Sequence, residues 1–171
     1  MRLTRLFKAG LAVLGMLAAS LMLIPSAVAA TPVSADPQVK WLAPLAIVRS
    51  SSPDQVTVAG TYKCSAPLDQ MHLWVSLKQG GPDPTAEGSS STVNAWYDTN
   101  ISQDVDVTCN GRWQHVFVKL GMHPTDFTGR ALTQLKTGHA WMQFCLVQGT
   151  DEATAIVASE SRWVKVLKIR H

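Results

Sequence analysis

The sequence predicts an all-β domain: an antiparallel β-sandwich, immunoglobulin-like, with about seven to nine strands, and a β-barrel as the alternative. Three observations predict this class. Apolar and polar residues alternate in several short segments, most clearly in residues 55–64. Turn-forming residues separate these segments at intervals of roughly 8–12 residues. Beyond residue 40, no segment has a convincing pattern of an amphipathic helix.

The first 30 residues are expected to be a cleaved signal peptide. A basic start is followed by an apolar run and then by small residues that suit a cleavage site. The apolar run is short for a membrane span, and it contains no cysteine that could carry a lipid. We therefore expect a secreted, extracellular protein with no membrane anchor after cleavage. Residues 31–40 would be a flexible lead-in, and residues 41–171 a single domain.

Cleavage would also change the overall charge. Three of the 15 basic residues lie within residues 1–30, whereas all 12 acidic residues lie beyond them, so the remaining chain has 12 of each sign. A nucleic-acid partner or an anionic membrane surface normally requires a basic excess. The composition therefore predicts neither partner.

The expected strands begin with residues 41–48, where Pro44 would confine pairing to an edge. In residues 55–64, one side carries Val56, Val58, Gly60, Tyr62 and Cys64, as in a half-buried strand. Residues 71–78 alternate in the same way. A long loop, residues 79–91, then leads to a strand at residues 92–97.

Residues 103–109 and 112–120 flank an Asn-Gly dipeptide, which is typical of a tight turn, and are predicted to pair as a hairpin. Residues 139–148 are apolar on both faces, which indicates a central strand or a partner surface. Residues 156–159 and 162–169 are expected to form two closing strands.

The chain has three cysteines, Cys64, Cys109 and Cys145. In a secreted protein a disulfide is the default expectation. A Cys64–Cys145 bridge would resemble the inter-sheet bridge of antibody domains, but Gln143 occupies the position of that family's corner tyrosine. A Cys64–Cys109 bridge would join the ends of two strands and is the preferred pairing. Cys145 would then be buried and free, or would bridge to a second chain.

Several motifs resemble those of a family of small secreted bacterial proteins, mostly actinobacterial, built on a domain of unknown function. They are Gly-Thr-Tyr-Lys-Cys at residues 60–64, Leu-Lys-Gln-Gly at 77–80, Thr-Cys-Asn-Gly at 108–111 and Phe-Thr-Gly-Arg-Ala at 127–131. The resemblance implies a β-sandwich and supports pairing Cys64 with Cys109. It implies no activity and no functional residues. Cys145 departs from the family pattern and leaves a dimer through that residue open.

Six tryptophans are many for a chain of this length. Trp74 and Trp113 lie on the otherwise polar faces of their expected strands, and with Trp96 they form a candidate binding face. Exposed aromatic rings contribute large contact areas at low entropic cost. The alternative is that loops cover both sheet faces and that the rings are ordinary packing.

No other pattern indicates chemistry strongly. His72 and His115 could be cross-strand neighbours at a two-histidine metal site, but surface histidines are the simpler interpretation. Asp104 and Asp106 are best explained by a solvated strand face. We expect no catalytic residues, no metal and no cofactor.

We therefore expect a non-enzymatic module that acts by extracellular binding or as a structural component, in a monomer or in a dimer through Cys145. Its partner would be an extracellular protein or a glycan, with no nucleic acid. The first alternative is a carbohydrate or cell-wall binding domain that uses Trp74, Trp96 and Trp113. The second is a secreted protease inhibitor that presents residues 79–91.

Overall fold

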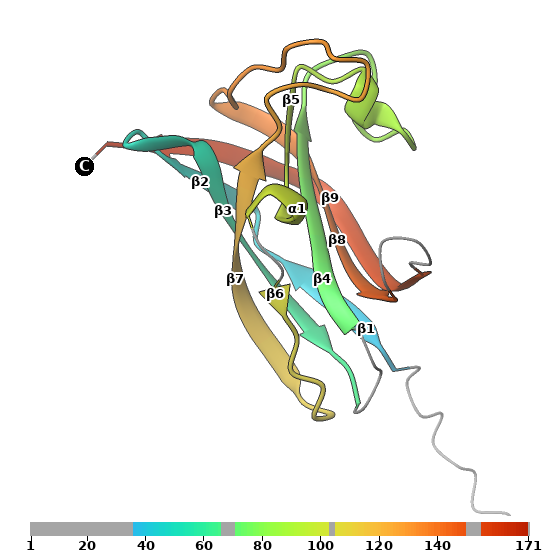
Figure 1. The fold of residues 1–171 in the computed structure, drawn as a ribbon. Coiled ribbons are helices and arrows are strands. Elements are labelled where there is room, and N and C mark those ends of the chain that lie inside the picture. The colour runs from blue at the N-terminus through green and yellow to red at the C-terminus, as the bar shows by residue number, and fades with distance from the viewer. Residues whose placement is uncertain (1–35, 66–70, 103–104, 150–154, 171) are drawn as a thin grey trace, which may run out of the picture. The chain divides into compact units, whose positions relative to one another are not determined.

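The computed structural model describes residues 36–65, 71–102, 105–149 and 155–170. The expected signal peptide and the first half of the expected lead-in, residues 31–35, lie outside these residues. No helix among the described residues is long and apolar enough to cross a membrane. The strands are β1 (Gln38–Leu42), β2 (Leu45–Arg49), β3 (Ser52–Lys63), β4 (Met71–Gln79), β5 (Ala95–Asp98), β6 (Val105–Asp106), β7 (Trp113–Met122), β8 (Gly138–Gln148) and β9 (Ala155–Ile169), with short helical turns η1 (Ser89–Ser91) and α1 (Thr99–Ser102) (Figure 1).

Seven strands form a closed ring in the order β3–β2–β9–β8–β4–β5–β7, and β7 pairs back onto β3. Neighbours are antiparallel except β2 and β9, which are parallel. β1 and β6 add to the edges of β3 and β4. The predicted all-β class is confirmed. The closed ring is the barrel that the sequence offered as an alternative, so the expected sandwich of separate sheets is wrong.

β3 is paired along both edges. One edge faces β7 from Gln55 to Lys63, and the other faces β2 and then β1. β1 and β2 are thus two parts of one strand, interrupted at Pro44, whose carbonyl accepts a 2.8 Å hydrogen bond from the Lys165 N–H. Pairing begins at Gln38, so the last three residues of the expected lead-in, 31–40, lie in the sheet.

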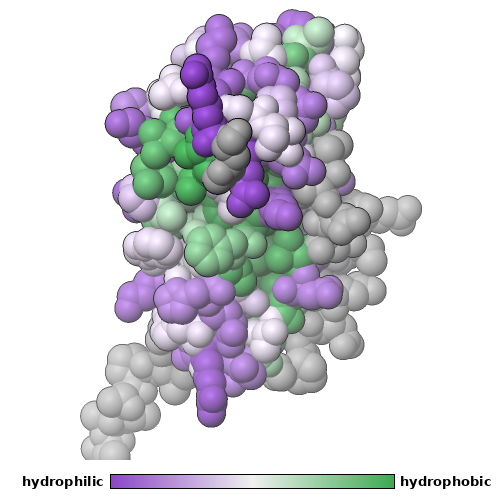
Figure 2. Space-filling model, turned by 90° about the vertical axis from the view of Figure 1, so that its left-hand side faces the viewer, coloured by the Kyte–Doolittle hydropathy of each residue, from purple (hydrophilic) through white to green (hydrophobic). Residues whose placement is uncertain are grey.

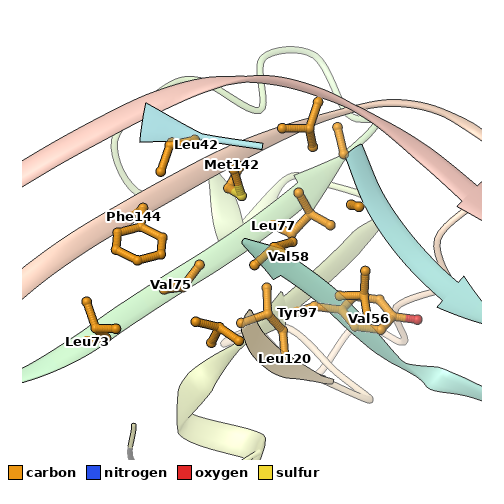
Figure 3. Close-up of a cluster of buried hydrophobic side chains, with 14 of the residues drawn as sticks. Leu42, Val56, Val58, Leu73, Val75, Leu77, Tyr97, Leu120, Met142 and Phe144 are labelled. Atoms are coloured by element: carbon orange, nitrogen blue, oxygen red, sulfur yellow. The ribbon is translucent and has the colours of Figure 1, made fainter. Parts of the chain in front are cut away.

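The interior of the ring is apolar. The predicted inward residues of β3 are buried, and they pack with inward residues of β4, β7, β8 and β9 (Figure 3). Gly60 lies against Phe144 of β8: a Cβ at this position would be 2.6 Å from a carbon of the Phe144 ring. The absence of a side chain at Gly60 therefore provides the space that the Phe144 ring occupies.

The predicted hairpin around Asn110 and Gly111 is wrong. β6 is only two residues long and pairs with β4, whereas β7 pairs with β3 and β5. Two features explain the difference. β5, α1 and β6 follow one edge of β4, where the Thr99 hydroxyl accepts a 3.2 Å hydrogen bond from the Val75 N–H. The turn itself is tied to the end of β3 by a 2.9 Å bond from the Gly111 N–H to the Cys64 carbonyl.

The strands predicted at residues 139–148, 156–159 and 162–169 agree more closely with the structure. β8 lies between β4 and β9, as its two apolar faces predicted. The two expected closing strands are one continuous strand, β9, with a register irregularity between Leu146 and Val147 on its partner.

The preferred disulfide, Cys64–Cys109, is confirmed. It joins the end of β3 to the segment before β7 across 45 residues of sequence, with a Cα–Cα distance of 4.6 Å. Cys145 is free and buried. The bridge therefore fixes the segment between β6 and β7, which has little strand pairing of its own.

Gly60→Ala is expected to lower the free energy of unfolding by about 1–3 kcal/mol, because the added methyl group meets the Phe144 ring. Urea denaturation followed by tryptophan fluorescence measures this loss. Adding Phe144→Leu to Gly60→Ala should give a loss smaller than the sum of the two single losses. Strictly additive losses would show that the two residues do not compete for space.

Replacing both Cys64 and Cys109 by alanine should lower the free energy of unfolding by about 3–4 kcal/mol, because the bridge restricts the unfolded chain over a long loop. The same urea titration measures the effect. Cys145→Ala is the control that leaves the bridge in place, and it should lose less. An unchanged midpoint in the double variant would contradict the stabilising role.

Candidate ligand-binding groove

A groove of about 480 Å³ lies on the outer face of β1, β3 and β7. It is lined by Lys40, Trp41, Thr61, Trp113 and His115. The sheet register explains why they meet: Trp41 is opposite Thr61, and Thr61 is opposite His115, so the three residues form one row across the strands. Trp113 is two residues before His115 on the same face of β7.

A register irregularity in β1 shapes one wall of the groove. The pairing with β3 shifts between Val39 and Trp41, which leaves Lys40 as the extra residue. Such a bulge redirects side chains, and here both Lys40 and Trp41 line the groove. Sequence reasoning placed Trp41 in a strand but missed it as a site residue, because alternation cannot reveal a bulge that shifts the inward and outward positions.

The groove combines exposed aromatic surface with polar groups. Trp41 is 48% exposed and Trp113 is 37% exposed. The Lys40 ammonium lies 5.5 Å from the centroid of a Trp113 ring, within the range of a cation–π interaction. Thr61 Oγ1 and His115 Nδ1 are 3.0 Å apart, which orients the imidazole. The site therefore offers two indole surfaces, one cation and a fixed hydrogen-bonding pair.

The three tryptophans predicted to share a binding face do not lie together. Trp113 lines the groove, but Trp96 is buried and stacks on His123 with ring centroids 3.6 Å apart. The Phe127 ring also contacts the Trp96 indole, with ring centroids 5.0 Å apart. Trp74 is half-buried on β4, opposite Cys145 of β8. Trp96 is covered because the segment after β7 folds over it, a long-range contact that strand alternation does not reveal.

The outer face of β4, β5 and β8 carries a separate buried polar cluster. The Lys78 ammonium donates a 3.1 Å hydrogen bond to Gln143 Oε1, and His123 Nε2 lies 2.9 Å from Asp98 Oδ2. Burial lowers the pKa of Lys78, and the Asp98 carboxylate opposes that shift. The buried polar groups of this face thus contact one another, which is consistent with a structural role.

The histidines predicted as a candidate metal site do not lie together either. His72 is opposite Asp106, whereas His115 is opposite Thr61 on another part of the ring. Asp104 lies outside the described residues. Hydrogen bonds from Thr128 hold the pKa of Asp126 below its usual range, and Arg130 Nε donates to it at 2.9 Å. Within the described ranges, no group of three or more His, Cys, Asp or Glu side chains is placed to hold a metal ion.

Burial raises the pKa of the Cys145 thiol to about 11, although the Lys78 charge acts in the opposite direction. The thiolate is the reactive form of cysteine. A buried thiol with so little thiolate behaves as a small apolar side chain. Cys145 is thus buried in the single chain, and a bridge from it to a second chain stays a prediction.

The fold and the groove together define a closed all-β domain with an aromatic surface groove. No family model matches the chain, and no curated protein matches it. Among solved structures, it shows a remote likeness to DesR, a β-glucosidase from Streptomyces venezuelae in complex with D-glucose. The two are 14% identical with a TM-score of 0.33, and the match covers 75% of this chain and 15% of that chain. A likeness this remote carries no argument about function.

In the native protein at pH 8, Cys145 should react with a thiol-blocking reagent on the order of 100-fold more slowly than an exposed thiol, given its raised pKa. In denaturant without reductant, one thiol per chain should be blocked, and peptide mapping should locate it at Cys145. Intact mass measurement reads both results. Rapid blocking of the native protein, or a disulfide-linked dimer, would contradict the burial of Cys145.

Proposed function

We propose that this protein is a secreted, non-enzymatic binding module whose ligand is an extracellular glycan held in the groove between Trp41 and Trp113. The observation that carries the proposal is the pair of exposed indoles on one sheet face. The Cys64–Cys109 bridge supports secretion, because disulfides persist mainly in oxidising compartments.

The chemistry of the groove suits a sugar. The C–H faces of a sugar ring pack on flat aromatic rings, and tryptophan supplies that surface with few rotatable bonds. Lys40 and His115 stand beside the indoles and can bond to hydroxyl groups. The groove also lies within the size range of small-molecule sites, which is roughly 300–1,000 Å³.

Other expectations from the sequence stay predictions. A structural role outside the cell and an immunoglobulin-like topology belong to this group. So does the protease-inhibitor alternative, whose loop is ordered by local bonds such as that from the Thr85 hydroxyl to Asp83 Oδ1 at 2.6 Å. The aromatic groove favours the glycan over these alternatives.

Titration with soluble glycans and cell-wall polysaccharides should change the tryptophan fluorescence. Trp41→Ala and Trp113→Ala should each weaken binding by about 2 kcal/mol, as expected for a central aromatic contact. Isothermal titration calorimetry measures the affinities.

Trp163→Ala is the matched control, because Trp163 is 47% exposed but does not line the groove. It should bind as the unaltered protein does. The proposal would fail if no glycan in the panel bound, or if Trp163→Ala weakened binding as much as Trp41→Ala.

A further inference from the structure

A second surface, next to the groove, carries four apolar side chains that the interior does not use; three are exposed and the fourth, Leu167, is half-buried. Leu45 and Ile47 project outward from β2, Phe117 from β7 and Leu167 from β9. The register brings them together, since Ile47 is opposite Leu167 and Phe117 is opposite the small residue Ala59 of β3. Phe117 is 82% exposed. We call these four residues the apolar patch.

Basic side chains surround the apolar patch. Arg49 follows Ile47 on the outer side of β2, Lys119 follows Phe117 on β7, and Lys165 precedes Leu167 on β9. Among the exposed residues of β2, β3, β7 and residues 161–169 of β9, the one acidic side chain is Asp54 near the start of β3, whose Oδ1 accepts a 2.9 Å hydrogen bond from Gln134 Nε2. Figure 2, which faces the side where β2, β3 and β7 lie in Figure 1, shows hydrophobic residues near the centre with hydrophilic residues around them.

A polar groove of about 210 Å³ adjoins the patch. Ile47 lines it together with Arg49, Ser52, Gln55, Thr57 and Lys119. Two cations among neutral hydrogen-bonding side chains match the charge and the acceptor oxygens of a phosphate group. The surface thus places a site for a phosphate directly beside a site for hydrocarbon.

We propose that this face docks on an anionic phospholipid bilayer, with lipid phosphates at Arg49 and Lys119 and the apolar patch in the interfacial region. Basic residues gain free energy near anionic lipid, and exposed apolar side chains add to it by burial. A soluble polyanion would satisfy the charges but leave Phe117 in water. A second copy of the same face would bring basic residues against basic residues.

This inference goes beyond the proposed glycan binding. It also refines the conclusion from overall charge: a chain with balanced charges can still present one face on which most of the charged side chains are basic. The aromatic groove and the proposed membrane-docking face both use β7. Trp41 lines the aromatic groove alone, and Arg49 lines only the polar groove beside the apolar patch. Each property can therefore be removed separately.

The test is flotation of the secreted protein with vesicles that contain no glycan. One set contains phosphatidylcholine alone, and the other also contains phosphatidylglycerol. We expect binding to the anionic set, weaker binding at 0.5 M salt than at roughly 0.1 M because charges are screened, and little binding to the neutral set.

Variants test the named residues. Phe117→Ser should weaken binding about tenfold, because burial of the ring is lost. Arg49→Gln and Lys165→Gln should each weaken it about fivefold. Phe127→Ser and Lys136→Gln are matched controls outside the face, since Phe127 is 78% exposed and Lys136 is exposed, and both should bind as the unaltered protein does.

The inference would be overturned by no flotation with anionic vesicles, by equal binding to both vesicle sets, or by a Phe117→Ser variant that binds normally. Self-association that Phe117→Ser abolishes, without vesicle binding, would assign the patch to a second copy and also overturn it. Trp41→Ala should keep vesicle binding, whereas Phe117→Ser should keep glycan binding. Failure of one proposal is therefore distinguishable from failure of the other.

Discussion

The pairing of β3 on both edges is the constraint on which the rest of the structure depends. Its whole length beyond Asp54 is bonded to β7, while its other edge holds β2 and then β1, so it is the strand at which the ring closes. Its inward residues support the core, and Gly60 leaves room for Phe144 from β8. Cys64, at its end, is bridged to the segment before β7. Ring closure, core packing and the disulfide thus all depend on β3 and its end at Cys64.

Two parts of the outer surface of the ring differ in the kind of side chain that they carry. Over β4, β5 and β8, charged groups are buried and compensated by one another, as Lys78 and Asp98 illustrate. Over β1, β2, β3 and β7, aromatic and aliphatic side chains remain exposed beside basic residues. Exposed apolar surface of this kind marks interaction sites. Both proposals concern this second side because its aromatic and aliphatic side chains are exposed.

Local sequence patterns predicted the features that are set within a single strand, such as which side chains point inward. Alternation identified the inward face of β3 and the outward position of Trp113, and strand ends identified the Cys64–Cys109 bridge. Pairing between distant segments was not predictable in this way. The Asn110–Gly111 dipeptide predicted a turn, but the partner of β7 is β3, some 50 residues earlier, rather than β6. The bulge at Lys40 and the burial of Trp96 by the segment after β7 were not predicted for the same reason. Each depends on contacts between segments that are distant in sequence.

The place of β2 between β3 and β9 has a consequence for the timing of folding. Its partner in β9 is the last described stretch of strand, from Lys165 to Ile169. A chain that emerges N-terminus first must therefore leave one edge of β2 unpaired until residues 165–169 have appeared. Such long-range pairing makes folding slow, because the loop entropy is lost before the contacts form. The ring can therefore close only after synthesis has delivered the chain as far as Ile169.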